Sequence, residues 1–136
     1  MTKFDTSLVL DISGMFNGCE SLKKIDVSKF KTSNVVCMKD LFHDCKNLTS
    51  LDLLNFDISA VTDMSSMFSN CESLTSLDIS HFNGTNVWGM DYMFSGCKKL
   101  TSLNLSIFFL KKKIVFGFHI CLMGVKVWRE LNFQNM

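Results

Sequence analysis

The chain contains no proline and no apolar run long enough to cross a membrane. Its longest apolar segment, residues 114–125, has 12 residues, whereas a membrane-spanning helix needs about 20. No secretory signal is expected at the start, because Met1-Thr2-Lys3 leads straight to Phe4-Asp5-Thr6-Ser7 with no apolar run. Residues 1–110 also have no net positive charge, because they contain nine Lys against twelve Asp or Glu. This balance excludes the basic surface that nucleic-acid binding requires, so no nucleic-acid partner is expected.

The sequence also lacks the residue patterns of an active site. His43, His81 and His119 fall at unrelated positions of the repeat described below. No Cys–His spacing is typical of a zinc site, and there is no glycine-rich phosphate loop or nucleophile elbow. The sequence therefore predicts a protein that is not an enzyme and that has no cofactor and no metal ion.

What the chain does have is a repeat of 26 residues without slippage. Fixed self-similarity of this length is typical of a solenoid, in which stacked units bury a continuous core. The recurring positions are Met15-Phe16, Leu41-Phe42, Met67-Phe68 and Met93-Phe94; Cys19, Cys45, Cys71 and Cys97; Leu22, Leu48, Leu74 and Leu100; and Phe30, Phe56, Phe82 and Phe108.

Within one repeat the apolar spacing changes from helical to strand-like. The apolar residues of segment 61–71 fall three or four apart, which predicts a one-sided helix. In segment 74–80, Leu77 and Ile79 alternate with polar residues, which predicts a half-buried strand. The expected fold class is therefore α/β: a leucine-rich-repeat-like solenoid of about four stacked helix–strand units with a parallel sheet on one face.

The repeat also gives the expected domain organisation. The solenoid covers residues 1–109, as a partial repeat 1–14, repeats 15–40, 41–66 and 67–92, and a partial repeat 93–109. Because the chain begins within a repeat, without a capping unit, it is expected to be a fragment of a longer array. Residues 110–136 abandon the pattern and carry five Lys or Arg and one Glu.

Three interpretations of the 110–136 segment remain open. It is a hydrophobic cap on the last unit, a membrane-proximal anchor whose three lysines face anionic lipid, or out-of-frame sequence. The third interpretation follows from residues 108–113. A run of thymines followed by a run of adenines in the coding DNA would encode them, and the reading frame can slip on such a run. Membrane contact through this segment is the weakest of the three, because its apolar core is short.

The interior is predicted from residues that hold a constant position in the repeat. The Met and Phe positions form one apolar stripe that stacking must bury. Four of the six cysteines share one position, which is typical of a packing residue and not of a disulfide framework. Disulfide pairing between repeats is the alternative, but we expect buried, reduced thiols.

The repeat resembles that of the BspA-type leucine-rich-repeat surface proteins over about residues 4–108. The resemblance is carried by Phe56-Asp57-Ile58-Ser59-Ala60-Val61-Thr62-Asp63-Met64-Ser65-Ser66-Met67-Phe68, followed by Cys71 and residues 74–80. The chain departs from the pattern at residues 8–10, at Leu54 and after Phe109. The resemblance implies a non-catalytic protein-binding or adhesion module, exposed on a cell surface or secreted, that binds a protein of a host or neighbouring cell. The alternatives are an intracellular interaction scaffold and a decayed gene fragment without a function of its own.

The alternation of the expected strand predicts which residues face outward. They form rows, one residue per repeat, and make up the candidate protein-binding face: Lys24, Asp26, Ser50, Asp52, Leu54, Ser76, Asp78, Ser80, Ser102 and Asn104. The aspartate row has two interpretations. It is either a cation or docking strip, or a set of carboxylates that bond neighbouring hydroxyl groups and backbone amides, which is the interpretation we favour because one row seldom supplies enough ligands for calcium.

Overall fold

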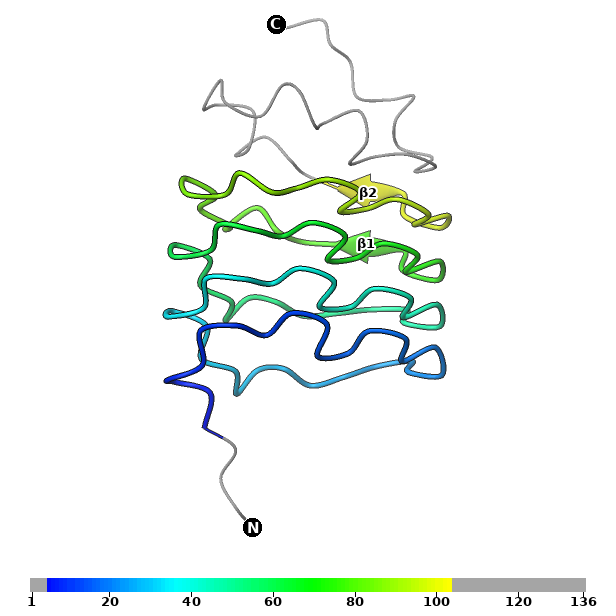
Figure 1. The fold of residues 1–136 in the computed structure, drawn as a ribbon. Coiled ribbons are helices and arrows are strands. Elements are labelled where there is room, and N and C mark those ends of the chain that lie inside the picture. The colour runs from blue at the N-terminus through cyan, green and yellow to red at the C-terminus, as the bar shows by residue number, and fades with distance from the viewer. Residues whose placement is uncertain (1–4, 104–136) are drawn as a thin grey trace, which may run out of the picture.

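A computed structural model describes residues 5–103 of the chain, and the 110–136 segment and Asn104 lie outside these residues. The chain winds into flat coils stacked one on another, with residue 5 at one end and residue 103 at the other (Figure 1). Parallel bridges join Asp11 to Cys37, Cys37 to Asp63 and Asp63 to Gly89. Each bridge joins residues 26 apart, so the sequence repeat sets the register of the stack.

The α/β fold class expected from the sequence is wrong. The described residues contain no helix and only two strands, β1 (Ser76–Leu77) and β2 (Ser102–Leu103). The two strands pair in parallel, Ser76 with Ser102 and Leu77 with Leu103. The expected sheet across all units is thus reduced to one short pair, and the fold is a stack of coils made mainly of turns.

Segment 61–71 is not helical because its backbone alternates in handedness. Ser66 and Asn70 have φ of 56° and 59°, in the left-handed region that a right-handed helix cannot contain. Each coil repeats both positions, so left-handed residues occur in two series: Gly14, Asp40, Ser66 and Tyr92, and Gly18, Asp44, Asn70 and Gly96. The result is a run of tight turns, closed by bonds such as the Met67 N–H to the Met64 carbonyl at 3.2 Å.

The turns leave alternate backbone groups free to bond the next coil. The N–H groups of Met64, Ser66, Phe68 and Asn70 donate to carbonyls 25 residues later, at 2.7–2.9 Å. The preceding coils repeat this set at residues 12–18 and 38–44. These bonds between coils replace the bonds that a helix would make within itself.

Each coil has two long sides, for which we use fixed names. The turn side comprises residues 8–20, 34–46, 60–72 and 86–98; the strand side comprises residues 22–30, 48–56, 74–82 and 100–103. Asp63 and Ser76 are 13 residues apart in the sequence, half of a 26-residue coil. They therefore lie on opposite sides of the closed coil.

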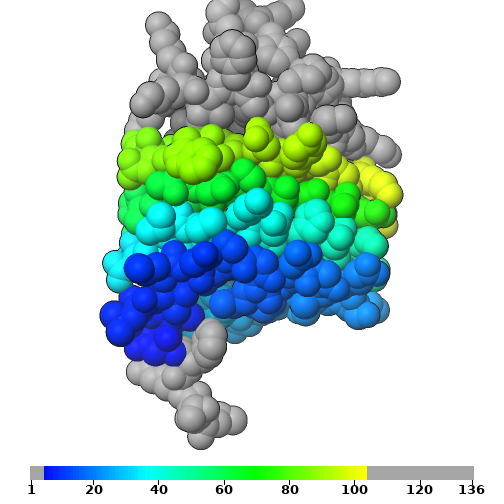
Figure 2. Space-filling model, viewed as in Figure 1, coloured from blue at the N-terminus to red at the C-terminus, as the bar shows by residue number. Residues whose placement is uncertain are grey.

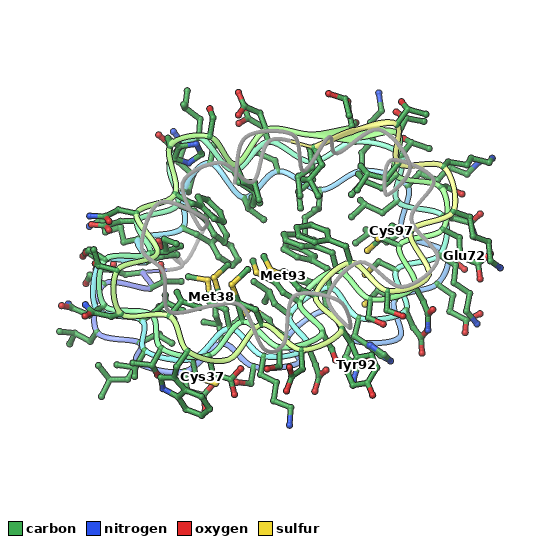
Figure 3. The ribbon with its side chains drawn as sticks, turned by 90° about the horizontal axis from the view of Figure 1, so that it is seen from above. Cys37, Met38, Glu72, Tyr92, Met93 and Cys97 are labelled. Atoms are coloured by element: carbon green, nitrogen blue, oxygen red, sulfur yellow. The ribbon has the colours of Figure 1, made fainter. Side chains whose placement is uncertain are left out.

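The interior contains the residues that the repeat predicted, except in the first coil, where Met15 is 39% exposed although Leu41, Met67 and Met93 at the same repeat position are buried. Met38, Met93 and Cys97 point into the oval enclosed by the coil, whereas Glu72 and Tyr92 point outward (Figure 3). The fully buried set includes Phe42, Phe68, Phe82, Phe94, Met38, Leu41, Leu48, Leu53, Ile58, Met64, Met67 and Leu74. Space-filling atoms of successive coils meet along the face in view, so the coils pack directly on one another (Figure 2).

The phenylalanines of the turn side form a continuous stack through the interior. The rings of Phe42 and Phe68 lie 5.8 Å apart with 7° between their planes, and Phe68 and Phe94 lie 5.5 Å apart with 10°. Such ring pairs contribute about 0.5–1.5 kcal/mol each beyond the area they bury. The Phe stack therefore favours one coil register over its neighbours.

A row of alternating charges reinforces this register at the surface. Lys46 pairs with Glu20 at 2.7 Å, and Lys98 pairs with Glu72 at 2.9 Å, one coil apart in each case. The pairs are partly or largely exposed, so each stabilises the fold by no more than about 1 kcal/mol. A shifted register would separate these partners, so the pairs favour the observed register.

Candidate binding surfaces

The strand side presents the predicted face to solvent. Leu77 and Ile79 point inward, at 5% and 0% exposure, while Ser76, Asp78 and Ser80 are exposed. The other described members of the face are exposed as well: Lys24, Asp26, Ser50, Asp52, Leu54 and Ser102. The alternation thus located the outward rows correctly, although only two short strands form among residues 5–103.

Each carboxylate of the aspartate row closes a turn within its own coil. One carboxylate oxygen of Asp26, Asp52 and Asp78 accepts the backbone N–H two residues later, at 2.9 Å in each case. Side-chain and backbone hydrogen bonds from Ser28 and Ser80 hold the pKa values of Asp26 and Asp78 below their usual range. Among residues 5–103, no group of three or more His, Cys, Asp or Glu side chains is placed to hold a metal ion. The geometry agrees with a structural role for this row.

A shallow, open depression of about 340 Å³ lies among these rows. Ser50, Asp52, Leu54, Ser76 and Asp78 contribute to its lining. His81 also contributes to the lining, and its imidazole Nε2 lies 3.1 Å from the Leu53 carbonyl oxygen. Leu54 stands beside it with 71% of its surface exposed, where the other strand ends have serine. The depression can receive a protruding side chain, but it is too open to exclude water from a reaction.

Among residues 5–103 the cysteine row forms no disulfide, and three of its four members are buried as the repeat predicted; Cys19, in the first coil, is only partly buried. Cys45, Cys71 and Cys97 are free and fully buried. The thiols of Cys71 and Cys97 donate to the carbonyls of Phe42 and Phe68, at 3.3 and 3.1 Å. Burial raises the pKa of Cys45 to about 11 and that of Cys97 to about 12. These thiols are therefore poor nucleophiles near neutral pH, because the thiolate is the reactive form.

Asp44 contacts its neighbour His43 and also joins two coils through Asn70. His43 Nε2 lies 3.3 Å from one oxygen of Asp44, and the Asn70 amide donates to the other at 2.9 Å. Asp44 and Asn70 are both left-handed residues of the turn side. His43 Nδ1 is buried and has no hydrogen-bond partner in the part of the chain that the structure describes. Because the carboxylate is used between coils, this arrangement supports the stack.

The turn side carries an exposed apolar surface that the repeat pattern did not predict. The exposed large hydrophobic residues of this side are Leu8, Leu10, Met15, Val36, Trp88 and Tyr92. Leu10, Val36 and Trp88 occupy one repeat position, together with Thr62. That shared position is visible in the sequence, but a helical interpretation of this side obscured its outward direction.

No helix among the described residues is long and apolar enough to span a membrane. Residues 1–108 match the profile of a family described as Mycoplasma protein of unknown function, DUF285. No curated protein and no solved structure matches the chain. Because the match covers most of its length, the chain belongs to this family. The match ends at Phe108, the last phenylalanine that keeps the 26-residue spacing.

Proposed function

We propose that this member of the Mycoplasma family is a non-catalytic protein-binding or adhesion module of a protein exposed at a cell surface. The proposed ligand is a protein of a host or neighbouring cell, which binds to the strand side. The resemblance of residues 4–108 to the BspA-type surface repeats supports the class of function. The exposed strand-side rows support the choice of surface.

One observation carries the proposal: nine outward residues lie in fixed rows on a tightly packed stack. Leu54 and Leu53 also contribute to the lining of the depression. Protein interfaces have an apolar centre within a polar rim, and a rigid surface loses little entropy on binding. Leu54 within rows of Ser and Asp has this composition.

Binding of the fluorescently labelled chain to cultured animal cells tests the proposal. We expect saturable binding that trypsin treatment of the cells abolishes, because the ligand is a protein. Leu54→Arg should weaken binding by about tenfold, since a charge would replace the apolar centre. Trp88→Ser is the matched control, because Trp88 is similarly exposed, at 74%, but lies on the turn side.

Two results would contradict the proposal. Binding that survives trypsin treatment would exclude a protein ligand. Equal losses for Leu54→Arg and Trp88→Ser would show that the strand side is not the binding surface. Circular dichroism and thermal unfolding of both variants must match the parent chain for this comparison to hold.

A further inference from the structure

The exposed hydrophobic side chains are concentrated on one side of the stack. Among residues 5–103, six of the seven exposed large hydrophobic residues lie on the turn side and Leu54 lies on the strand side; of the six, Met15 occupies the repeat position that is buried as Leu41, Met67 and Met93 in the other coils. Exposed single residues are ordinary, but a group on one side marks a contact surface. The turn side therefore carries a second candidate surface, distinct from the proposed strand-side site.

Backbone hydrogen bonds align three of these residues in one column. The Val36 N–H donates to the Leu10 carbonyl at 2.7 Å, and the Trp88 N–H donates to the Thr62 carbonyl at 2.9 Å. The Thr62 N–H donates to the Val36 carbonyl at 2.8 Å, which links the two pairs. We call Leu10, Val36, Thr62 and Trp88 the apolar column. It presents one residue per coil, ending in an indole that is 74% exposed.

Carboxylates lie directly beside this column. Asp11 and Asp63 belong to the neighbouring row of parallel bridges, and a Cβ on Gly89 would meet a carboxylate oxygen of Asp63. The glycine next to Trp88 thus leaves room for that carboxylate. Asp91 is exposed, and its side chain makes no hydrogen bond or ion pair with the described residues.

The charge around the column is negative, unlike that of the strand side. Residues 10–14, 36–40, 62–66 and 88–92, which we call the acidic face, contain four Asp and one Lys, a net charge of 1 − 4 = −3. The strand side contains three Lys and three Asp, a net charge of zero. The acidic face would repel nucleic acid and anionic lipid and attract a cation.

Tyr92 adds a second aromatic group at a strained position. It has φ of 59° and is 47% exposed, at the repeat position that holds Gly14, Asp40 and Ser66 in the other coils. A bulky residue in the left-handed region is uncommon, and such strain is concentrated at functional sites. Figure 3 shows Tyr92 on the outside of the coil, as it does Cys37 of the neighbouring row.

We propose that the acidic face binds a basic segment of a partner protein, with lysine or arginine side chains alternating with aliphatic ones. The cationic group lies against the Trp88 indole and within reach of Asp91, since aromatic faces attract cations. The aliphatic side chains pack on Val36 and Leu10. The negative charge thus favours the basic side chains of the segment, and the apolar column favours its aliphatic side chains.

A labelled peptide of alternating lysine and leucine is the probe, and its fluorescence anisotropy with the full chain is the measurement. The control peptide replaces each lysine with glutamate. We expect binding of the lysine peptide alone, weakening as salt rises because the attraction is electrostatic. Equal binding of the two peptides would overturn the charge argument and with it the proposal.

Four variants locate the binding site. Trp88→Ser should weaken lysine-peptide binding by about tenfold, and Asp91→Asn by about threefold. Lys39→Gln should tighten it by about twofold, because this change removes the one cation of the acidic face. Leu54→Ser, matched to Trp88 in exposure, should leave binding unchanged. All four side chains are exposed, so the fold should be retained.

Other outcomes would overturn the proposal. If Trp88→Ser leaves binding unchanged, the peptide binds elsewhere. If sedimentation shows self-association of the chain that Trp88→Ser abolishes, a second copy covers the face. Because the cell-binding experiment depends on Leu54 and this one on Trp88, either proposal can fail without the other.

Discussion

The two sides of each coil achieve burial by different backbone arrangements. On the turn side, four backbone N–H groups of the first coil donate hydrogen bonds to carbonyls of the second coil; they belong to Ile12, Gly14, Phe16 and Gly18. On the strand side, the Thr49 N–H bonds the Lys23 carbonyl at 3.1 Å, and the β1–β2 pair comes two coils later. Spacing of apolar residues therefore identifies inward side chains on both sides, but it does not tell how the backbone is bonded.

Truncation of a buried ring should separate the two sides most strongly. Phe68→Ala and Phe82→Ala both remove a fully buried phenyl group, at a cost of about 3–5 kcal/mol. Phe68 also stacks on Phe42 and Phe94, whereas Phe82 contacts the His81 ring edge-on. We expect a loss about 1 kcal/mol larger for Phe68→Ala in urea unfolding. Equal losses would show that the Phe stack adds no stability.

Two glycines test the left-handed conformation of the turn side. Gly18 and Gly96 have φ of 72° and 74°, but a Cβ on Gly96 would collide with the Asn70 amide oxygen while one on Gly18 would meet nothing. Gly18→Ala should cost about 1 kcal/mol from backbone strain alone. Gly96→Ala should cost about 2 kcal/mol or more, because Asn70 must move. A difference below the error of chemical denaturation would contradict the packing around Gly96.

Alkaline pH should destabilise the turn side through its buried thiols. A raised pKa means that folding keeps the thiol protonated while the unfolded chain releases the proton. The free energy of unfolding is therefore unaffected by these thiols below their pKa in the unfolded chain, about 8.5–9. It falls as pH rises from there towards their pKa values in the folded chain, about 11 for Cys45 and about 12 for Cys97. The expected loss is about 1.4 kcal/mol per thiol per pH unit in that interval.

The informative measurement is the slope of the thermal midpoint against pH, and not the midpoint at any one pH. Cys97→Ala will lower stability at every pH, but its thermal midpoint should fall less steeply between pH 9 and pH 10. An unchanged slope would mean that the Cys97 thiol does not contribute to the pH dependence.

The smallest expected effect is a gain in stability at the acidic face. Tyr92→Asn replaces a bulky left-handed residue with one that tolerates the conformation, so it should stabilise the chain by about 0.5–1 kcal/mol. Ser66→Asn, at the same repeat position one coil earlier, is the matched control and should change stability less. A destabilised Tyr92→Asn variant would show that the Tyr92 ring contributes packing that exceeds its backbone strain.

Much of the burial pattern could be predicted from the sequence, but the secondary structure could not. Val61, Met64 and Cys71 are buried as a helical stripe would bury them. A series of three-residue turns also returns side chains inward every three or four residues, so spacing alone did not distinguish it from a helix. The series Gly18, Asp44, Asn70 and Gly96 was the available signal, because these residue types favour left-handed backbone.

The predicted strand face was located correctly because alternation depends only on neighbouring residues. The acidic face was missed because its outward direction depends on the turn geometry at residues 62–66 and 88–92. Its charge was readable from the sequence, but its grouping around Trp88 required the stacked coils.

The sequence by itself determined the 26-residue register, the inward Phe, Met, Cys and Leu positions, and the outward rows of the strand side. It did so because each repeat must bury the same apolar positions against its neighbours. Only the tertiary structure decided that no helix forms among residues 5–103 and that Leu10, Val36 and Trp88 share one exposed column. The reason is that backbone groups of the turn side find their partners 25 residues away, in the next coil, and the spacing of apolar residues does not specify that choice.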